Sequence, residues 1–211
     1  LTLGFVVVCA WMSGPVAAAP EPSSAVSDWQ LSIEFHDPQR ISVALPGESE
    51  PVTYWYLLYT VTNDSGRDVD YYPAFDLVTN ALEVVVGGAE VHPKVYDAIA
   101  ERHKKDFPFF APPAAIRGPL IQGRDNARTS AAVFREFNPD ADAFTVFVAG
   151  LSGEVVRVSN PSFDVSRPES ETNKRAFVLR KTLALEYKLP GEATTRSTGV
   201  PVRVDRKWVM R

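Results

Sequence analysis

The chain has 211 residues, of which 45% are hydrophobic and 23% charged, and its formal net charge at pH 7 is −4. A chain of this size can bury a stable core without help from disulfides or metals. The small negative charge, together with Lys and Arg residues that are not interleaved with stacking aromatics, argues against nucleic-acid binding.

Residues 1–18 are predicted to be a signal peptide. No charged residue precedes Glu21, a helix-breaking Gly14-Pro15 follows the apolar run, and the small residues 16–19 supply a cleavage pattern. We expect cleavage after Ala18 and export of the protein to the periplasm or the exterior. If the segment were part of a longer apolar stretch and were retained, it would instead anchor the protein in a membrane.

The only cysteine, Cys9, lies inside this predicted signal peptide. Its removal leaves a chain without any thiol. Disulfides, Cys-ligated metals, iron–sulfur clusters and thiol nucleophiles are therefore all excluded from the expected mature protein.

The predicted mature chain opens with a disordered lead-in, residues 19–27, which offers few apolar side chains to bury. From residue 28 the dominant pattern is the alternation of apolar and polar residues that is typical of strands. It covers residues 29–36 and 41–45, which are joined by Asp37-Pro38. We predict an antiparallel hairpin from these two strands.

Residues 52–62 are apolar or aromatic on both faces, which indicates a central strand covered on both sides. The strand should end at the turn sequence Asn-Asp-Ser-Gly, residues 63–66. Further on, residues 82–86 and 89–91 flank Gly87-Gly88, a pattern that predicts another hairpin.

Residues 93–105 are predicted to form one helix inserted between strands, because Pro93 suits the first helical position and basic residues fill the last turn. The following loop, residues 106–113, is rich in proline and carries Phe107, Phe109 and Phe110. Exposed apolar patches mark partner sites, so these three residues are the candidate contact surface for another protein. The alternative is that the loop folds back and caps an open end of the domain.

Three short strands are expected at residues 131–137, 144–149 and 154–158, and a long apolar face runs from residue 177 to 189. Many short strands separated by turns, with prolines suited to turns and edges, favour a mainly β fold. We predict an immunoglobulin-like antiparallel β-sandwich with one inserted short helix, forming a single domain over residues 28–211. A barrel is the alternative architecture.

Charge is unevenly distributed along the chain. Residues 21–83 contain eleven acidic and two basic residues, whereas residues 174–211 contain ten basic and three acidic ones. One explanation is that the first and last strands lie close together and attract each other. The other is a basic surface for an anionic polymer, with Arg203, Arg206 and Lys207 as the candidate contacts.

No motif in the chain specifies a reaction. The three histidines, His36, His92 and His103, lack the close spacings of zinc ligands. Gly150-Leu-Ser-Gly153 lacks the spacing of a hydrolase nucleophile elbow. Phosphate-binding glycine loops are absent as well, so no catalytic, metal or cofactor residue is predicted and nucleotide binding is not expected.

Residues 59–66 (Tyr-Thr-Val-Thr-Asn-Asp-Ser-Gly), followed by Val69 and Pro73-Ala-Phe75, form a strand–turn–strand phrase. This phrase resembles one found in uncharacterised exported bacterial proteins with immunoglobulin-like sandwiches. The resemblance implies a fold and a cell-envelope setting, and it carries no active-site residue with it.

The sequence therefore predicts an exported, non-enzymatic β-sandwich that acts as an interaction or structural module in the cell envelope, with another envelope or extracellular protein as its partner. Two alternatives remain. One is a module that binds an anionic or polysaccharide envelope polymer, and the other is a hydrolase whose site forms only in the folded chain.

Overall fold

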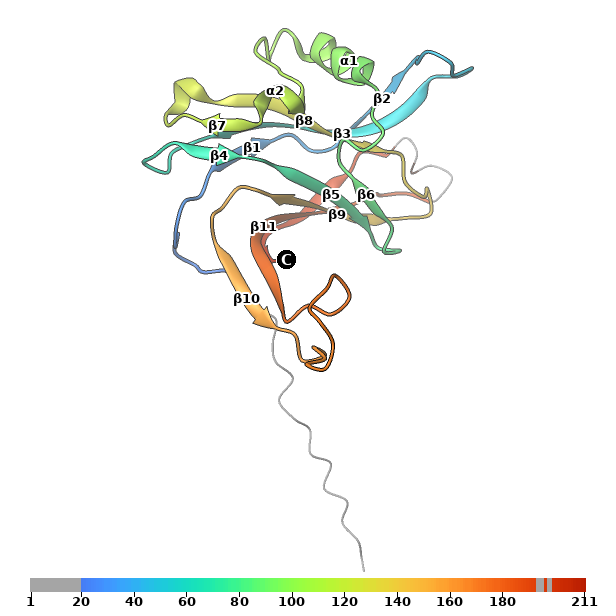
Figure 1. The fold of residues 1–211 in the computed structure, drawn as a ribbon. Coiled ribbons are helices and arrows are strands. Elements are labelled where there is room, and N and C mark those ends of the chain that lie inside the picture. Colours follow the sequence, from blue (N-terminus) through green and yellow to red (C-terminus); the bar gives the residue numbers. More distant parts are fainter. Residues whose placement is uncertain (1–19, 193–195, 197–198) are drawn as a thin grey trace, which may run out of the picture.

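The computed structural model describes residues 20–192, 196 and 199–211 (Figure 1). The predicted signal peptide, residues 1–18, lies outside the described residues. The described chain is a mainly β protein built from antiparallel sheets, as predicted at that level. Within these residues, no helix is both long and apolar enough to cross a membrane.

The first sheet, called sheet 1 below, is built around β3 (Val52–Thr62). One edge of β3 pairs with β8 (Arg128–Arg135), and the other edge pairs with both β1 (Ser32–Phe35) and β2 (Gln39–Val43). All of these pairings are antiparallel.

The predicted hairpin between the first two strands is wrong, because β1 and β2 follow each other along the same edge of β3. Phe35 pairs with Tyr59 and Gln39 pairs with Tyr56, so three residues on the outer strand oppose two on β3. The extra residue makes Asp37-Pro38 a β-bulge rather than a hairpin turn. Proline is tolerated there because an edge bulge needs no ladder N–H at that position.

The second sheet, sheet 2, is organised around the long strand β11 (Ala176–Lys188). One edge of β11 pairs with β12 (Val202–Met210), and the other pairs with β9 (Ala143–Ala149) and then β10 (Val155–Ser159). Beyond β9 come β5 (Ala74–Thr79) and β6 (Val84–Val86). β10 and the part of β11 that pairs with it extend beyond the rest of sheet 2, on the side away from sheet 1 (Figure 1).

The predicted hairpin around Gly87-Gly88 is also wrong, since β6 pairs back with β5 and residues 87–90 form a turn. The N–H of Gly87 donates to the carbonyl of Phe75, and the N–H of Gly88 donates to the carbonyl of Val133. These bonds direct the chain across to β8 instead of letting it return along β6.

Two hydrophobic cores flank β3. Trp55, Leu57 and Tyr59 belong to a core that also contains the inner residues of sheet 2, whereas Tyr54 and Tyr56 belong to a core that also contains residues of a helix. The prediction of a central strand covered on both faces is therefore confirmed. The molecule has three layers, with the helix above sheet 1 and sheet 2 below it (Figure 1).

This helix, α1 (Pro93–His103), confirms the predicted inserted helix. It begins at Pro93 after the N-cap residue His92, whose Nδ1 accepts the N–H of Lys94 at 3.1 Å. Val95 and Ile99 are fully buried against sheet 1. The proline-rich stretch that follows contains a helical turn, α2 (Pro113–Ile116), which was not predicted.

Three further short elements complete the described chain. β4 (Val69–Tyr71) pairs with β7 (Gly118–Leu120), and η1 (Arg124–Asn126) is a single 3₁₀ turn. The pairing holds the α2 segment against the end of the first core, since Val69, Tyr71 and Leu120 are buried in it.

The predicted lead-in has no helix or strand over residues 20–27, but it is anchored at Ser23. The Ser23 N–H donates to Oε1 of Glu154 at 2.7 Å, and its carbonyl accepts from Nζ of Lys181 at 2.9 Å. Glu154 and Lys181 are both buried and form an ion pair at 3.2 Å. At Ser23 the lead-in is therefore ordered, because the buried ion pair forms hydrogen bonds with its N–H and its carbonyl.

Candidate functional site

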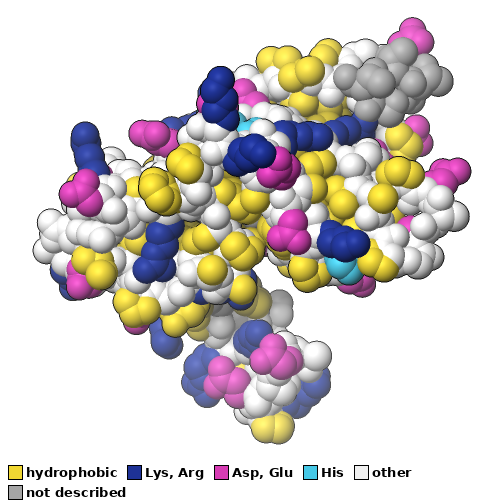
Figure 2. All heavy atoms as spheres, turned by 90° about the horizontal axis from the view of Figure 1, so that it is seen from above, with side chains coloured by type: hydrophobic (Ala, Val, Ile, Leu, Met, Phe, Trp, Pro, Cys, Tyr) yellow, Lys and Arg dark blue, Asp and Glu magenta, His cyan; other side chains and the backbone are white. Residues whose placement is uncertain are grey.

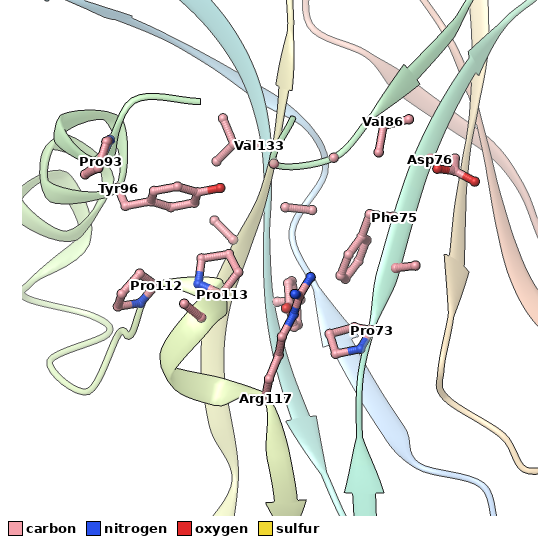
Figure 3. Close-up of a pocket in the computed structure, with 17 residues that line it drawn as sticks. Pro73, Phe75, Asp76, Val86, Pro93, Tyr96, Pro112, Pro113, Arg117 and Val133 are labelled. Atoms are coloured by element: carbon pink, nitrogen blue, oxygen red, sulfur yellow. The ribbon is translucent and has the colours of Figure 1, made fainter. Parts of the chain in front are cut away.

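A pocket of about 540 Å³ lies beside β8, where sheet 1, sheet 2 and the two helices meet (Figure 3). This volume falls within the range of small-ligand sites in proteins. Its floor comes from residues 131–133 of β8 and from Tyr59 of β3. The site therefore rests on the best-buried part of the fold.

Four prolines and two aromatic rings contribute to the pocket walls. On one side lie Pro93 and Tyr96 of α1 together with Pro112 and Pro113 at the start of α2. The opposite side is formed by residues 73–76 and 86–88, from β5, β6 and the turn that follows β6. Proline has a fixed φ and no N–H, so these walls are stiff and poor in hydrogen-bond donors.

One cation enters this apolar space. Figure 3 shows Arg117 extending between Pro113 on one side and Pro73 and Phe75 on the other. Within the described residues, its guanidinium forms no hydrogen bond and no ion pair. The pocket's one carboxylate, Asp76, is instead bound to Arg211 at 3.0 Å. An unneutralised positive charge therefore remains in the pocket.

Two phenols accompany Arg117. Burial raises the pKa of Tyr59 to about 12, while the neighbouring hydroxyls of Tyr71 and Ser130 and the charge of Arg117 act in the opposite direction. Burial also raises the pKa of Tyr96, again opposed by Arg117. Both phenols are therefore neutral near pH 7 and able to donate a hydrogen bond.

The predicted contact residues of the proline-rich loop do not act together. Phe107 and Phe110 are half-buried and pack against the core beneath α1. Phe109, by contrast, has 89% of its surface exposed. The loop thus folds back over sheet 1 and leaves only the Phe109 ring, of these three, largely exposed.

The predicted polymer contacts, all on β12, do not share one face. Arg203 pairs with Tyr187 and Arg206 with Leu185 across the ladder, so both point to the side of the first core, where their guanidinium groups lie over the ring of Phe35.

Lys207 points to the opposite side and is neutralised by Glu186 at 2.6 Å and Asp205 at 3.2 Å. Arg203 also contacts Asp37 at 3.8 Å, which links the acidic first part of the chain to the basic last part. On the face seen from above, Lys and Arg side chains also lie next to Asp and Glu (Figure 2).

The histidines lie outside the pocket lining. Nε2 of His103 is 2.9 Å from the hydroxyl of Tyr56, which donates to Oε1 of Gln39 at 2.8 Å. His36 packs edge-on against Phe107, whose ring also contacts His103. Burial lowers the pKa of His103, and the charge of Arg102 and the proximity of His36 lower it further.

In the part of the chain that the structure describes, no group of three or more His, Cys, Asp or Glu residues is arranged to hold a metal ion. Comparison of the chain with protein-family models, with curated proteins and with solved structures gave no match.

The pocket was missed in the sequence because its lining comes from segments that are far apart in the chain. Arg117 carries no local pattern that would set it apart from other surface arginines. The usable indications were the prolines at residues 112 and 113 and Gly87-Gly88, which were interpreted only as loop and turn residues.

Proposed function

We propose that the described chain has an immunoglobulin-like arrangement. In such domains the first, second and fifth strands lie side by side in one sheet, and the third, sixth and seventh in the other. If β1 and β2 count as one strand, β3 and β8 take the second and fifth places. The strands β5, β9 and β11 then take the third, sixth and seventh places, which supports the proposal.

The arrangement departs from that pattern beside β8. The fourth strand would lie there, at the outer edge of the fifth. Here the chain between β6 and β8 instead carries α1 and α2, and the pocket opens at that edge. The candidate site thus occupies the place of a strand.

We propose that the protein is a non-enzymatic binding module that holds a segment of another protein in this pocket. The observation that carries the proposal is the combination of stiff apolar walls with the unneutralised guanidinium of Arg117. Apolar walls with a few polar groups are the usual composition of a binding site. The proposed setting, the periplasm or the exterior, rests on the predicted signal peptide.

A site-specific photo-crosslinker can test this function. We expect a crosslinker at Ala114, an exposed pocket residue, to capture one discrete partner in native envelope preparations. The matched control is a crosslinker at Val165, which is 87% exposed and not part of the pocket lining.

Reversing the charge in the pocket with Arg117→Glu should abolish the Ala114 product. Equal capture at Ala114 and Val165, or capture that survives Arg117→Glu, would show that the pocket is not the binding site.

A second candidate is binding of an anionic polymer at β12. Arg206 favours it, because its guanidinium forms no ion pair with a described residue and lies over Phe35. We expect salt-sensitive retention on heparin that weakens more with Arg206→Gln than with Lys207→Gln, because carboxylates already neutralise Lys207. Retention that is independent of salt would reject this candidate.

A further inference from the structure

β10 and the part of β11 that pairs with it form a two-stranded ribbon at the opposite end of the molecule from α1 and α2 (Figure 1). The ribbon comprises Val155–Ser159 and residues 176–180, of which seven are apolar, two are arginines and none is acidic. β12 pairs with β11 only from Arg180 onward, so within the described chain the ribbon has no third strand. A two-stranded ribbon is marginally stable in water, and a further strand would stabilise it.

The direction of the peptide groups along β10 follows from two hydrogen bonds at its ends. The carbonyl of Glu154 accepts the N–H of Lys181 at 3.0 Å, and the N–H of Asn160 donates to the carbonyl of Arg175 at 2.9 Å. Peptide groups alternate in direction along a strand. The even-numbered residues of β10 therefore bond to β11, and the odd-numbered ones direct their peptide groups outward.

The outward positions are Val155, Arg157 and Ser159, and all three residues are exposed to solvent. Among the described residues, no hydrogen bond reaches their N–H or C=O groups. Exposed, unpaired peptide groups on an edge strand are a ready template for pairing with another chain. The outer side of β10, called the ribbon edge below, therefore offers three accessible pairing positions in succession.

The ribbon edge is held rigid at both ends. At the far end, the buried side chain of Asn173 accepts the N–H of Asp164 at 2.9 Å and donates to three carbonyls of the loop over residues 160–175. At the near end, the buried ion pair between Glu154 and Lys181 joins β10 to β11. An added strand would therefore find the edge already ordered, which lowers the entropic cost of binding.

We propose that the ribbon edge binds an extended segment of another protein, in which one acidic residue is flanked by two apolar residues. The segment adds to β10 as a third strand and pairs with its outward peptide groups. Its acidic side chain lies opposite Arg157, whose guanidinium forms no ion pair with a described residue. Its apolar neighbours lie beside Val156 and Val158. This surface is separate from the pocket, whose lining includes no ribbon residue.

Arg157 favours an acidic partner over a second copy of the chain. If two copies paired along all of β10, two-fold symmetry would place the two Arg157 side chains directly opposite each other. Like charges in that position destabilise a pair of strands, whereas opposite charges stabilise it. Two other edges fit less well, because β6 has only three residues and β12 carries charged side chains on both faces.

NMR titration of the purified protein with two peptides tests the proposal. The peptides are acetyl-Ser-Thr-Val-Glu-Val-Thr-Ser-carboxamide and the same sequence with lysine in place of glutamate. We expect the glutamate peptide to slow hydrogen exchange at the amides of residues 155, 157 and 159, and to bind about 5- to 10-fold more tightly than the lysine peptide. Arg157→Glu should reverse this preference. The control Arg167→Glu, an exposed arginine in the loop beyond the ribbon, should preserve it.

Ser159→Pro separates strand addition from simple charge attraction. Proline removes an outward N–H that β11 does not use, so the melting temperature should stay close to that of the unmodified protein while peptide binding is lost. Ser159→Ala should keep the binding. Glutamate peptides methylated at their backbone nitrogens give the same test without a change in the protein, and we expect at least one of them not to bind.

Equal binding of the two peptides, or a failure of both to bind, would overturn the proposal. So would binding of the glutamate peptide that survives both Ser159→Pro and methylation. Slow exchange of the three outward amides in the protein alone, increasing with its concentration, would assign the ribbon edge to a second copy and would also overturn the proposal.

Discussion

Ile99→Ala is the sharpest test of the three-layer arrangement, because Ile99 is the fully buried side chain in the second half of α1. The substitution removes three carbon atoms, which costs about 2.4 kcal/mol of transfer free energy at ~0.8 kcal/mol per buried methylene. A residual cavity adds to this cost, and the better helix propensity of alanine returns a few tenths. We expect a net loss of about 2–4 kcal/mol in the free energy of unfolding.

Urea denaturation followed by tryptophan fluorescence measures this loss, since Trp55 lies in the core on the other face of β3. At a slope near ~2 kcal/mol per molar urea, the midpoint should fall by roughly 1–2 M. The control is Glu101→Ala on the exposed face of α1, which removes only the exposed ion pair with Lys104 and should cost less than about 0.5 kcal/mol. If the two variants have the same midpoint, α1 does not pack on sheet 1 as described.

Three further results are expected. The pKa of His103 is lower in the folded state than in the unfolded state, so the folded protein binds this proton less readily, and its stability should fall as the pH drops below about 6.5. Between pH 8 and 5, the urea midpoint of His103→Gln should therefore fall less than that of the unmodified protein. Parallel profiles for the two proteins would contradict this. Phe107→Ser should destabilise the fold, whereas Phe109→Ser should not, because only Phe107 packs on the core. Phe109→Ser is therefore the variant that can test a partner contact without a loss of stability. Equal melting temperatures for the two variants would show that Phe107 does not pack as described. Gly87→Ala should cost about 1–3 kcal/mol, because its Cβ would lie 2.8 Å from the carbonyl oxygen of Phe75, and an unchanged midpoint would show that β5 and the turn after β6 are not packed that closely.

The sequence predicted best the elements whose pattern has one physical cause. β3 was predicted over its observed length because both of its faces are apolar. The turn after it was predicted from Asn-Asp-Ser-Gly, and in the structure the side chain of Asn63 accepts the N–H of Ser65. α1 was found from its N-terminal proline and its basic last turn. In each case local chemistry and tertiary packing favour the same conformation.

Prediction failed where the sequence allows two geometries and packing chooses between them. Asp37-Pro38 suits a hairpin turn and an edge bulge equally, and the length of β3 selects the bulge by offering one edge to both strands. β12 was missed as a strand because charged residues fall on both of its faces. An edge strand whose outward groups remain in water needs no apolar alternation.

The site could not be predicted for a different reason. Its lining joins strands and helices that are far apart in the chain, and within the described residues the guanidinium of Arg117 has no ion-pair partner. Residue identities report what a side chain can bond, not which neighbours the fold brings to it.

The two hydrogen bonds that hold Ser23 constrain the order in which parts of the chain can fold. Ser23 leaves the ribosome early, yet the Lys181 that binds it lies 158 residues later in the chain. Closing so long a loop is entropically unfavourable until the intervening strands have formed. The hydrogen bonds at Ser23 can therefore form only after residue 181 has been synthesised and has come together with Glu154.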